Sequence, residues 1–302
     1  MKTISTKITL ILLILMAIGC VKKEAELKPT ESPEPIYGDY TLPQGSHEYD
    51  TEIAAFYKKY NTLILYKYEA KDIYWNITNS INAYYDAKTD NTIKGYMYIP
   101  ADENYIRPQL DLLNSYFFKY FPEDFLKKTL PRKLFLMDKY RLIDAGKGTI
   151  DKQKKTEYSI TGGIDYLGLT GGGPDILLMT AEQKRVFRGE AVNFFLQRLI
   201  TDGTIQRIAA FTNLTNYSLP MPTWEIQYAN GIIDWNNRQP STDWDAYLKM
   251  LVTTPYQKLI APGGFLHPGI DNKGTIRKKC DVMINYFKNE FSIDLQAIAN
   301  DQ

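Results

Sequence analysis

The stretch that decides the fold is Val186-Phe-Arg-Gly-Glu-Ala-Val-Asn-Phe-Phe195. Its apolar side chains recur at the spacing of a helix, and the pattern predicts a long, largely buried helix over residues 181–200. Thr180 stands just before this helix and Gln183 shortly after its start, which is the arrangement of a capping box. Gly189, in the middle, costs the helix about 1 kcal/mol relative to alanine. One interpretation is that it marks close packing between the helix and a sheet.

Strand and helix patterns alternate along the rest of the chain. Runs rich in β-formers predict strands at 62–68, 133–138 and 175–180, and glycines at 162–163 and 171–173 bracket another strand. Helical spacing predicts helices at 106–121, 243–252 and 275–289, whereas residues 213–239 form a loop-rich region. Strands interleaved with helices indicate an α+β or α/β domain.

The N-terminus has the pattern of a lipoprotein signal peptide. Lys2 and Lys7 precede an apolar run at 8–18, and a small residue then precedes Cys20. The run is too short to span a bilayer as a helix. Cleavage before Cys20 would leave an acylated cysteine, carrying palmitate or a similar chain. The alternative is an ordinary secretory signal with an incidental cysteine.

A proline-rich polar segment follows the cysteine. Such a composition buries too little apolar surface to fold alone and is typical of a tether. We therefore assign residues 1–19 to the signal peptide, 20–47 to the acylated cysteine and a flexible linker, and 48–302 to one folded domain. The charged tract 22–26 resembles the one that sends some Bacteroidetes lipoproteins to the outer face of the outer membrane, so we expect an outer-membrane protein exposed at the cell surface.

Charge and cysteine content argue against a nucleic-acid partner and against internal disulfides. The chain has 36 basic and 35 acidic residues, and this balance argues against nucleic acid as a partner. After acylation of Cys20 only Cys280 remains, so no internal disulfide can form. We expect Cys280 to be a buried core residue, because a free cysteine packs like a small hydrophobic side chain.

The order of the patterns resembles that of the zinc-binding metallopeptidase lipoproteins of Bacteroidetes, which are often found beside glycan-uptake genes. The resemblance covers nearly all of the mature chain. It implies a zincin-like fold in which a mixed β-sheet packs on a central, former active-site helix, with a mainly helical C-terminal part. It is carried by Tyr57-x-x-Tyr60-Asn61 before the first strand, Tyr120-Phe-Pro122 before Pro131–Leu136, the glycine-marked strands before the central helix, and the ending 282–295.

The resemblance also implies a site on the central helix. In that family a His-Glu-x-x-His segment holds zinc, because residues one turn apart share a helix face, and its glutamate acts as general base toward the zinc-bound water. Glu190 matches that base, but Gly189 and Asn193 stand at the two histidine positions, and neither can replace an imidazole. Asp243 and Asp245 fall in the region of the later acidic ligand; either one, or neither, could be its equivalent.

The histidine content decides the expected chemistry. The chain has two histidines, His47 and His267, and neither lies on the central helix. We therefore expect the family's zinc to be lost, with no other cofactor in its place. A zinc-bound water can have a pKa near 7, against about 15.7 for bulk water, a gap that a lone carboxylate does not close. Glu190 would then be a relic of a base, or simply a solvated or ion-paired glutamate.

Aromatic residues suggest a binding surface. The chain has 23 tyrosines and 4 tryptophans, and aromatic faces can stack on sugars or extended peptides. Trp224, Trp235 and Trp244 are the candidates. The plainer interpretation is that these rings fill the core and its rim.

These patterns lead to one function hypothesis and two rivals. The hypothesis is a membrane-anchored relative of zinc metallopeptidases, without catalysis, that serves as a binding or accessory component of a surface glycan or peptide uptake system together with other uptake proteins. One rival is an active peptidase with an atypical site. The other is a structural accessory that binds no small ligand.

Overall fold

The computed structural model describes residues 40–74, 82–236 and 238–301. Contacts divide the chain into Met1–Thr41 and Leu42–Gln302, and the fold described below is that of the second unit. The predicted signal peptide, Cys20 and most of the predicted linker lie outside the described residues. Within the described ranges, no helix has both the length and the apolar character needed to cross a bilayer.

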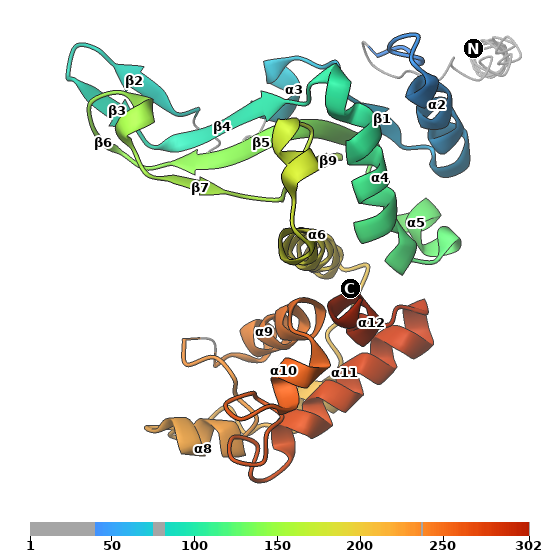
Figure 1. Ribbon diagram of the computed structural model, residues 1–302. Coiled ribbons are helices and arrows are strands. Elements are labelled where there is room, and N and C mark those ends of the chain that lie inside the picture. The colour runs from blue at the N-terminus through green and yellow to red at the C-terminus, as the bar shows by residue number, and fades with distance from the viewer. Residues whose placement is uncertain (1–39, 75–81, 237, 302) are drawn as a thin grey trace, which may run out of the picture. The chain divides into compact units, whose positions relative to one another are not determined.

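A mixed six-stranded sheet forms the upper layer of this unit (Figure 1). Along its main path, three parallel strands are followed by an antiparallel edge strand: β1 (Leu63–Leu65), β5 (Lys133–Ile143), β9 (Tyr166–Leu169) and β8 (Ile160–Gly162). The second half of β5 pairs with β4 (Gly95–Pro100) and β7 (Lys155–Glu157), both antiparallel to it. A small antiparallel sheet of β2 (Tyr84–Asp86), β3 (Asn91–Ile93) and β6 (Gly146–Lys147) extends from that end.

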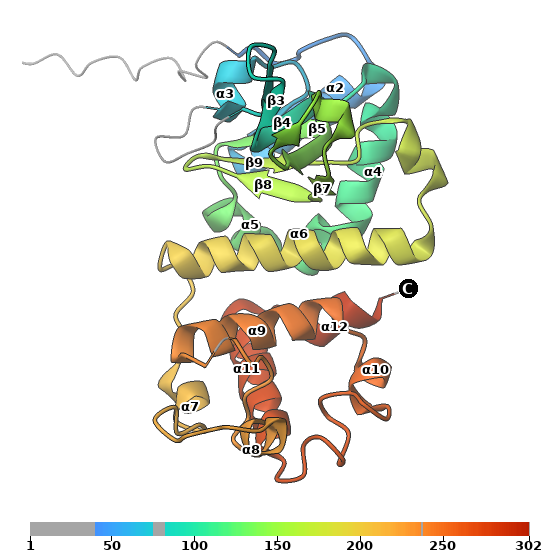
Figure 2. The same ribbon diagram turned by 90° about the vertical axis from the view of Figure 1, so that its left-hand side faces the viewer.

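Helices cover the sheet and fill the C-terminal part. The sheet is accompanied by α2 (Glu48–Tyr60), α3 (Ala70–Tyr74), α4 (Ile106–Tyr116) and α5 (Glu123–Thr129), with short 3-10 helices η1 (Glu103–Tyr105), η2 (Phe118–Tyr120), η3 (Ile150–Lys152) and η4 (Pro174–Leu178). The C-terminal part contains α7 (Ala209–Thr212), α8 (Trp224–Ala229), α9 (Pro240–Thr253), α10 (Tyr256–Ile260), α11 (Thr275–Phe291) and α12 (Leu295–Asn300). Between these two parts runs α6 (Ala181–Thr201), as both ribbon views show (Figure 2). The predicted α+β class, with a mixed sheet on a central helix and a mainly helical C-terminal part, is confirmed.

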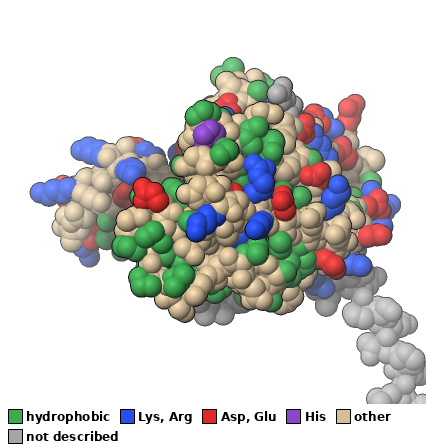
Figure 3. All heavy atoms as spheres, turned by 90° about the horizontal axis from the view of Figure 1, so that it is seen from below, with side chains coloured by type: hydrophobic (Ala, Val, Ile, Leu, Met, Phe, Trp, Pro, Cys, Tyr) green, Lys and Arg blue, Asp and Glu red, His purple; other side chains and the backbone are tan. Residues whose placement is uncertain are grey.

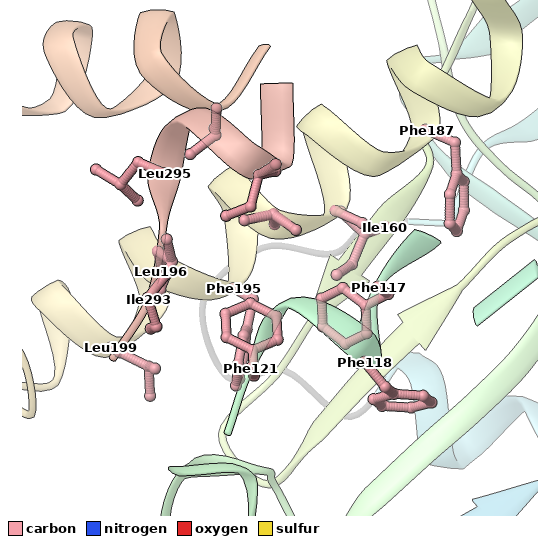
Figure 4. Close-up of a cluster of buried hydrophobic side chains, with 14 of the residues drawn as sticks. Phe117, Phe118, Phe121, Ile160, Phe187, Phe195, Leu196, Leu199, Ile293 and Leu295 are labelled. Atoms are coloured by element: carbon pink, nitrogen blue, oxygen red, sulfur yellow. The ribbon is translucent and has the colours of Figure 1, made fainter. Parts of the chain in front are cut away.

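The central helix α6 is buried along both sides. The Thr180 hydroxyl accepts from the Gln183 amide nitrogen at 3.2 Å, and the Thr180 amide donates back to the Gln183 side chain at 2.8 Å, so the predicted capping box is present. Phe195 meets Phe117 and Phe121 of the sheet layer edge to face, with ring centroids 5.5 and 5.2 Å apart. The same hydrophobic cluster continues through Leu196 and Leu199 of α6 to Ile293 and Leu295 of the C-terminal part (Figure 4). The buried residues of α6 therefore contact both the sheet layer and the C-terminal part, although the helix also carries several charged side chains.

Several predicted elements differ from the observed ones. The strand predicted at 175–180 is wrong, because these residues form most of η4 and lead into α6. Pro174 fixes a helical φ at the first position of η4, while Leu177 and Leu178 are 67% and 80% exposed, so this apolar run fills no sheet position. The strand at 62–68 is limited to β1, and the helix at 106–121 ends at Tyr116.

Other predictions stand. The helices predicted at 181–200, 243–252 and 275–289 correspond to α6, α9 and α11, and the strand between the glycines is β9. The strand predicted at 133–138 is the first half of the longer β5. Cys280 lies in the core with 1% of its surface exposed, and burial raises the pKa of its thiol.

Candidate functional site

Gly189, the residue at the first histidine position, lies in a packed contact between two helices. A Cβ atom added to Gly189 would lie 2.9 Å from the Thr253 methyl group and 3.2 Å from its Cα. The close approach is therefore to α9, and the predicted approach of Gly189 to the sheet is wrong. Because the Thr253 backbone itself is within reach, no side chain can extend from position 189 without displacing α9.

Asn193, at the second histidine position, belongs to the same face of α6. Gln197 donates to the Asp245 carbonyl at 3.4 Å, and Arg185 donates to the Thr253 carbonyl at 2.7 Å. These contacts set α6 and α9 antiparallel, so Asn193 points toward the middle of α9. Its Oδ1 atom is buried and has no hydrogen-bond partner within the described residues. A single neutral amide oxygen is a poor zinc ligand by itself.

Glu190 points the other way, toward the edge of the sheet. Its side chain is exposed, and its carboxylate accepts a hydrogen bond from the Ser159 hydroxyl at 2.5 Å. Ser159 lies between β7 and the edge strand β8, in a segment that continues the sheet from β5 to β9. The structure thus places Glu190 under the edge strand, but turned away from the contact of Gly189 with α9.

Asp243 has a structural role in the C-terminal part. It is fully buried against the Lys279 ammonium, and the Tyr217 hydroxyl donates to it at 2.7 Å. Lys279 also donates to the Thr215 hydroxyl and the Gly231 carbonyl, each at 3.0 Å. Burial raises the pKa of Asp243 and lowers the pKa of Lys279, because both charges lose water and their mutual attraction offsets only part of that loss. A carboxylate so engaged is not available as a metal ligand beside α6.

Asp245 is also engaged. Arg207 holds it through one nitrogen, 2.8 and 3.1 Å from the two carboxylate oxygens, at the partly exposed end of α9. The structure therefore brings neither Asp243 nor Asp245 to the position of a ligand next to Glu190. Each aspartate is held by a basic side chain of its own, Asp243 by Lys279 and Asp245 by Arg207.

The two histidines lie far from α6 in the fold. His47 precedes α2, where its ring is 3.2 Å from Glu103 and stacks on Tyr49. His267 accepts from the Gly269 amide within its own loop. Throughout residues 40–74, 82–236 and 238–301, no three His, Cys, Asp or Glu side chains are grouped so that they could hold a metal ion. The residues at the predicted zinc position do not fit the metal, because Thr253 closes the space in front of Gly189 and Asn193 offers a lone amide.

The three tryptophans fall into two environments. Trp244 is fully buried, edge to face with Phe211 at 5.0 Å, so it cannot present a ring to a ligand and its predicted binding role is wrong. Trp224 and Trp235 do meet, with centroids 5.0 Å apart, and Trp224 stacks on Tyr228 at 5.3 Å. Trp224 is 43% exposed on α8, and the view from below shows hydrophobic side chains gathered on this face (Figure 3).

A groove of about 470 Å³ opens between the sheet edge and the first turns of α6. We call it the α6 groove. Ser159, the partner of Glu190, stands at its border. Its lining includes Asp138, Tyr158, Ser159, Gln183, Val186 and Phe187. The groove is thus connected to the predicted relic base through Ser159. No sequence pattern pointed to Asp138, Ser159 or Thr253.

Comparison with known proteins gives little beyond the fold itself. No family model matches the sequence, and no curated protein matches it either. One solved structure is similar, a protein described as "a putative zinc-binding metallo-peptidase from Bacteroides caccae". It shares 14% sequence identity with this chain at a TM-score of 0.49, over 85% of this chain and 92% of that one. At these values the likeness supports no statement about the site.

Proposed function

We propose that this protein is a membrane-anchored lipoprotein related to zinc metallopeptidases, and that it has lost both zinc and catalysis. Acylated Cys20 and the linker would hold the folded domain at the outer membrane, at the cell surface. There it would serve as a binding component of a nutrient-uptake system, with a peptide or a glycan as ligand and other uptake proteins as partners. The support for this proposal comes from the central helix and from two surfaces.

The observation that carries the proposal is the contact between Gly189 and Thr253. A metal-binding helix needs an open space in front of both ligand positions. Here that space is closed by the end of α9, and the second position carries Asn193 with an unpartnered oxygen. Glu190, which stays exposed, bonds to Ser159 instead of facing a metal site.

Two surfaces could serve a binding role. The α6 groove offers a concave site with polar and apolar walls, the usual character of ligand sites. The Trp224–Trp235 pair offers exposed aromatic surface on α8, and such surface often marks contact with a sugar or another protein.

The metal content of the purified protein tests the proposal directly. We expect far less than one equivalent of zinc, measured by elemental analysis after dialysis against a zinc-containing buffer and then a metal-free one. A known zinc peptidase carried through the same steps is the control. One equivalent of zinc that survives dialysis would overturn the proposal.

The Ser159–Glu190 pair favours a second candidate, a hydrolase with an atypical site. A serine hydroxyl that donates to a carboxylate at 2.5 Å has the first contact of an activated nucleophile. Cleavage of casein or a peptide library would show this activity. It should be lost in both Ser159→Ala and Glu190→Gln, while Glu123→Gln, an exposed glutamate on α5 outside the groove, should keep it. Under the leading proposal none of these proteins cleaves the substrates.

A further inference from the structure

Asp138 is the unusual residue of the α6 groove. It lies on β5, where Gly171 donates its amide to the Asp138 carbonyl, and its side chain is 18% exposed. The carboxylate covers Gly173 so closely that a Cβ there would be 2.1 Å from one of its oxygens. Within the described residues its side chain accepts no hydrogen bond; its charge partner is the Lys139 ammonium, at 3.9 Å. Burial raises the pKa of Asp138, which is the expected response of a poorly compensated carboxylate.

The charges around the groove compensate Asp138 only in part. Lys139 is 2.5 Å from Asp175 and is neutralised there, so it compensates Asp138 only weakly. The other carboxylates that line the groove each have a basic partner: Glu157 with Arg141, Asp175 with Lys139, and Glu182 with Arg185. The groove therefore carries one negative charge in excess, and that charge lies at Asp138.

The walls beside Asp138 are apolar and aromatic. Tyr140 belongs to β5 and Tyr158 directly follows β7, with their ring centroids 6.2 Å apart. Across the groove, Leu178 and Val186 belong to η4 and α6 and are both well exposed. Aliphatic chains pack on such walls while a cationic end group reaches a carboxylate or a ring face.

We propose that the α6 groove binds an ammonium group on an aliphatic stem, with the Asp138 carboxylate accepting its N–H donors and the stem lying along Tyr158, Leu178 and Val186. This inference rests on the proposed binding role of the groove and names the chemistry of its ligand. A lysine side chain of a polypeptide and a free alkylamine both supply that group. A neutral oligosaccharide does not.

Binding measured by titration calorimetry separates these sources. The probes are a short lysine-containing peptide, the same peptide with Nε-acetyl-lysine, and 1,5-diaminopentane. If lysine in a polypeptide is the ligand, the first peptide binds and acetylation weakens binding roughly tenfold or more, since a hydrogen bond to a charged group is lost. If a free amine is the ligand, diaminopentane binds as well as the peptide or better.

Variants tie the effect to Asp138. Asp138→Asn keeps the shape of the side chain and should weaken binding of the charged probe roughly tenfold or more. Asp144→Asn, which removes a carboxylate just beyond the end of β5 and outside the groove, should change it little. Leu178→Ala removes an exposed side chain that no fold contact requires and should weaken binding of the longer stem.

The outcomes are distinct from those that test the proposed function. Equal binding of the acetylated peptide, unchanged affinity in Asp138→Asn, or no binding of any charged probe would each overturn this inference. Zinc-free protein that binds a neutral peptide or oligosaccharide would keep the proposed binding role while refuting the ammonium site. One equivalent of bound zinc would instead defeat the proposed function.

Discussion

At the scale of single residues, Thr253 and Gly189 define what α6 can do. A glycine in mid-helix costs about 1 kcal/mol relative to alanine, and here that loss accompanies a helix–helix approach that places α9 backbone 3.2 Å from where a Cβ would be. The position has therefore become part of the core. A histidine placed at this position would therefore not form a metal site.

Histidines introduced at positions 189 and 193 test whether the contact with α9 prevents metal binding. We expect Gly189→His/Asn193→His to bind no stoichiometric zinc, because the imidazole at 189 would overlap Thr253. Overpacking of this kind costs about 1–3 kcal/mol, so the midpoint of urea unfolding should fall. Val186→His, at an exposed position of the same helix, should leave the midpoint nearly unchanged. Tight zinc binding by the double variant would mean that α9 moves away readily.

The pH dependence of stability follows from Asp138. Because burial raises its pKa above the unfolded value, the folded protein loses stability as pH rises from the unfolded pKa through the folded one. Asp138→Asn should therefore raise the melting temperature at pH 7. The gain should disappear below about pH 4, where the carboxyl is protonated in both states. The charged neighbours that act on this pKa are Lys139, Arg141, Asp175 and Glu157.

Thermal melts of the wild type and Asp138→Asn from pH 3 to pH 8 measure the effect. Asp144→Asn, a more exposed acid at the end of the same strand, is the control. A lower melting temperature for Asp138→Asn at pH 7 would show that the carboxylate is well compensated in the folded state.

At the scale of elements, the C-terminal part is held together by a buried charge pair between two helices and a loop. Lys279 of α11 reaches Asp243 of α9, and it also bonds to Thr215 and Gly231 of the loop-rich region. These buried contacts link the loop-rich region to α9 and α11. Removing one member leaves an uncompensated charge, which is far more costly than an absent pair.

Lys279→Met tests the buried pair. We expect a loss of about 3–5 kcal/mol in the free energy of unfolding, because Asp243 remains buried and unpaired. Lys279→Met/Asp243→Asn should recover a large part of the loss. Lys278→Met, its exposed neighbour on α11, should have almost no effect. Urea unfolding measures all three, and equal stability of the two single variants would contradict a structural role for the pair.

Local patterns predicted the elements whose stability is local. The helix α6 has its cap and its apolar spacing within one stretch, and α11 has a continuous apolar face, so both were predicted closely. The apolar leucines of the η4 segment predict a strand, but the segment forms a 3-10 helix and leaves Leu177 and Leu178 exposed. Of the candidate site, Glu190 and Gly189 could be predicted from a resemblance. Ser159, Thr253 and Asp138 come from distant segments and carry no local signal.

At the scale of the whole molecule, α6 separates a sheet layer from a helical layer and belongs to the cores of both. Because both sides of α6 are covered, a cleft at its middle would require α9 or the sheet to move away. Any ligand site is therefore expected at the surface. The α6 groove and the exposed Trp224 ring on α8 both lie at the outside of this arrangement. For the proposed binding role, the domain has to be held at the place where it meets its ligands and partners.

Lipid attachment would supply that location, and Cys20 is the residue to test. One acyl chain gives only marginal, reversible membrane binding, whereas two or more anchor a protein stably. We therefore expect the wild-type protein to incorporate labelled palmitate and to stay in the membrane fraction after an alkaline wash. Cys20→Ser should lose the label and leave the membrane, while Cys280→Ser, at the buried cysteine, should keep both properties. Membrane retention of unlabelled Cys20→Ser after the wash would show that something other than a lipid on this cysteine holds the protein there.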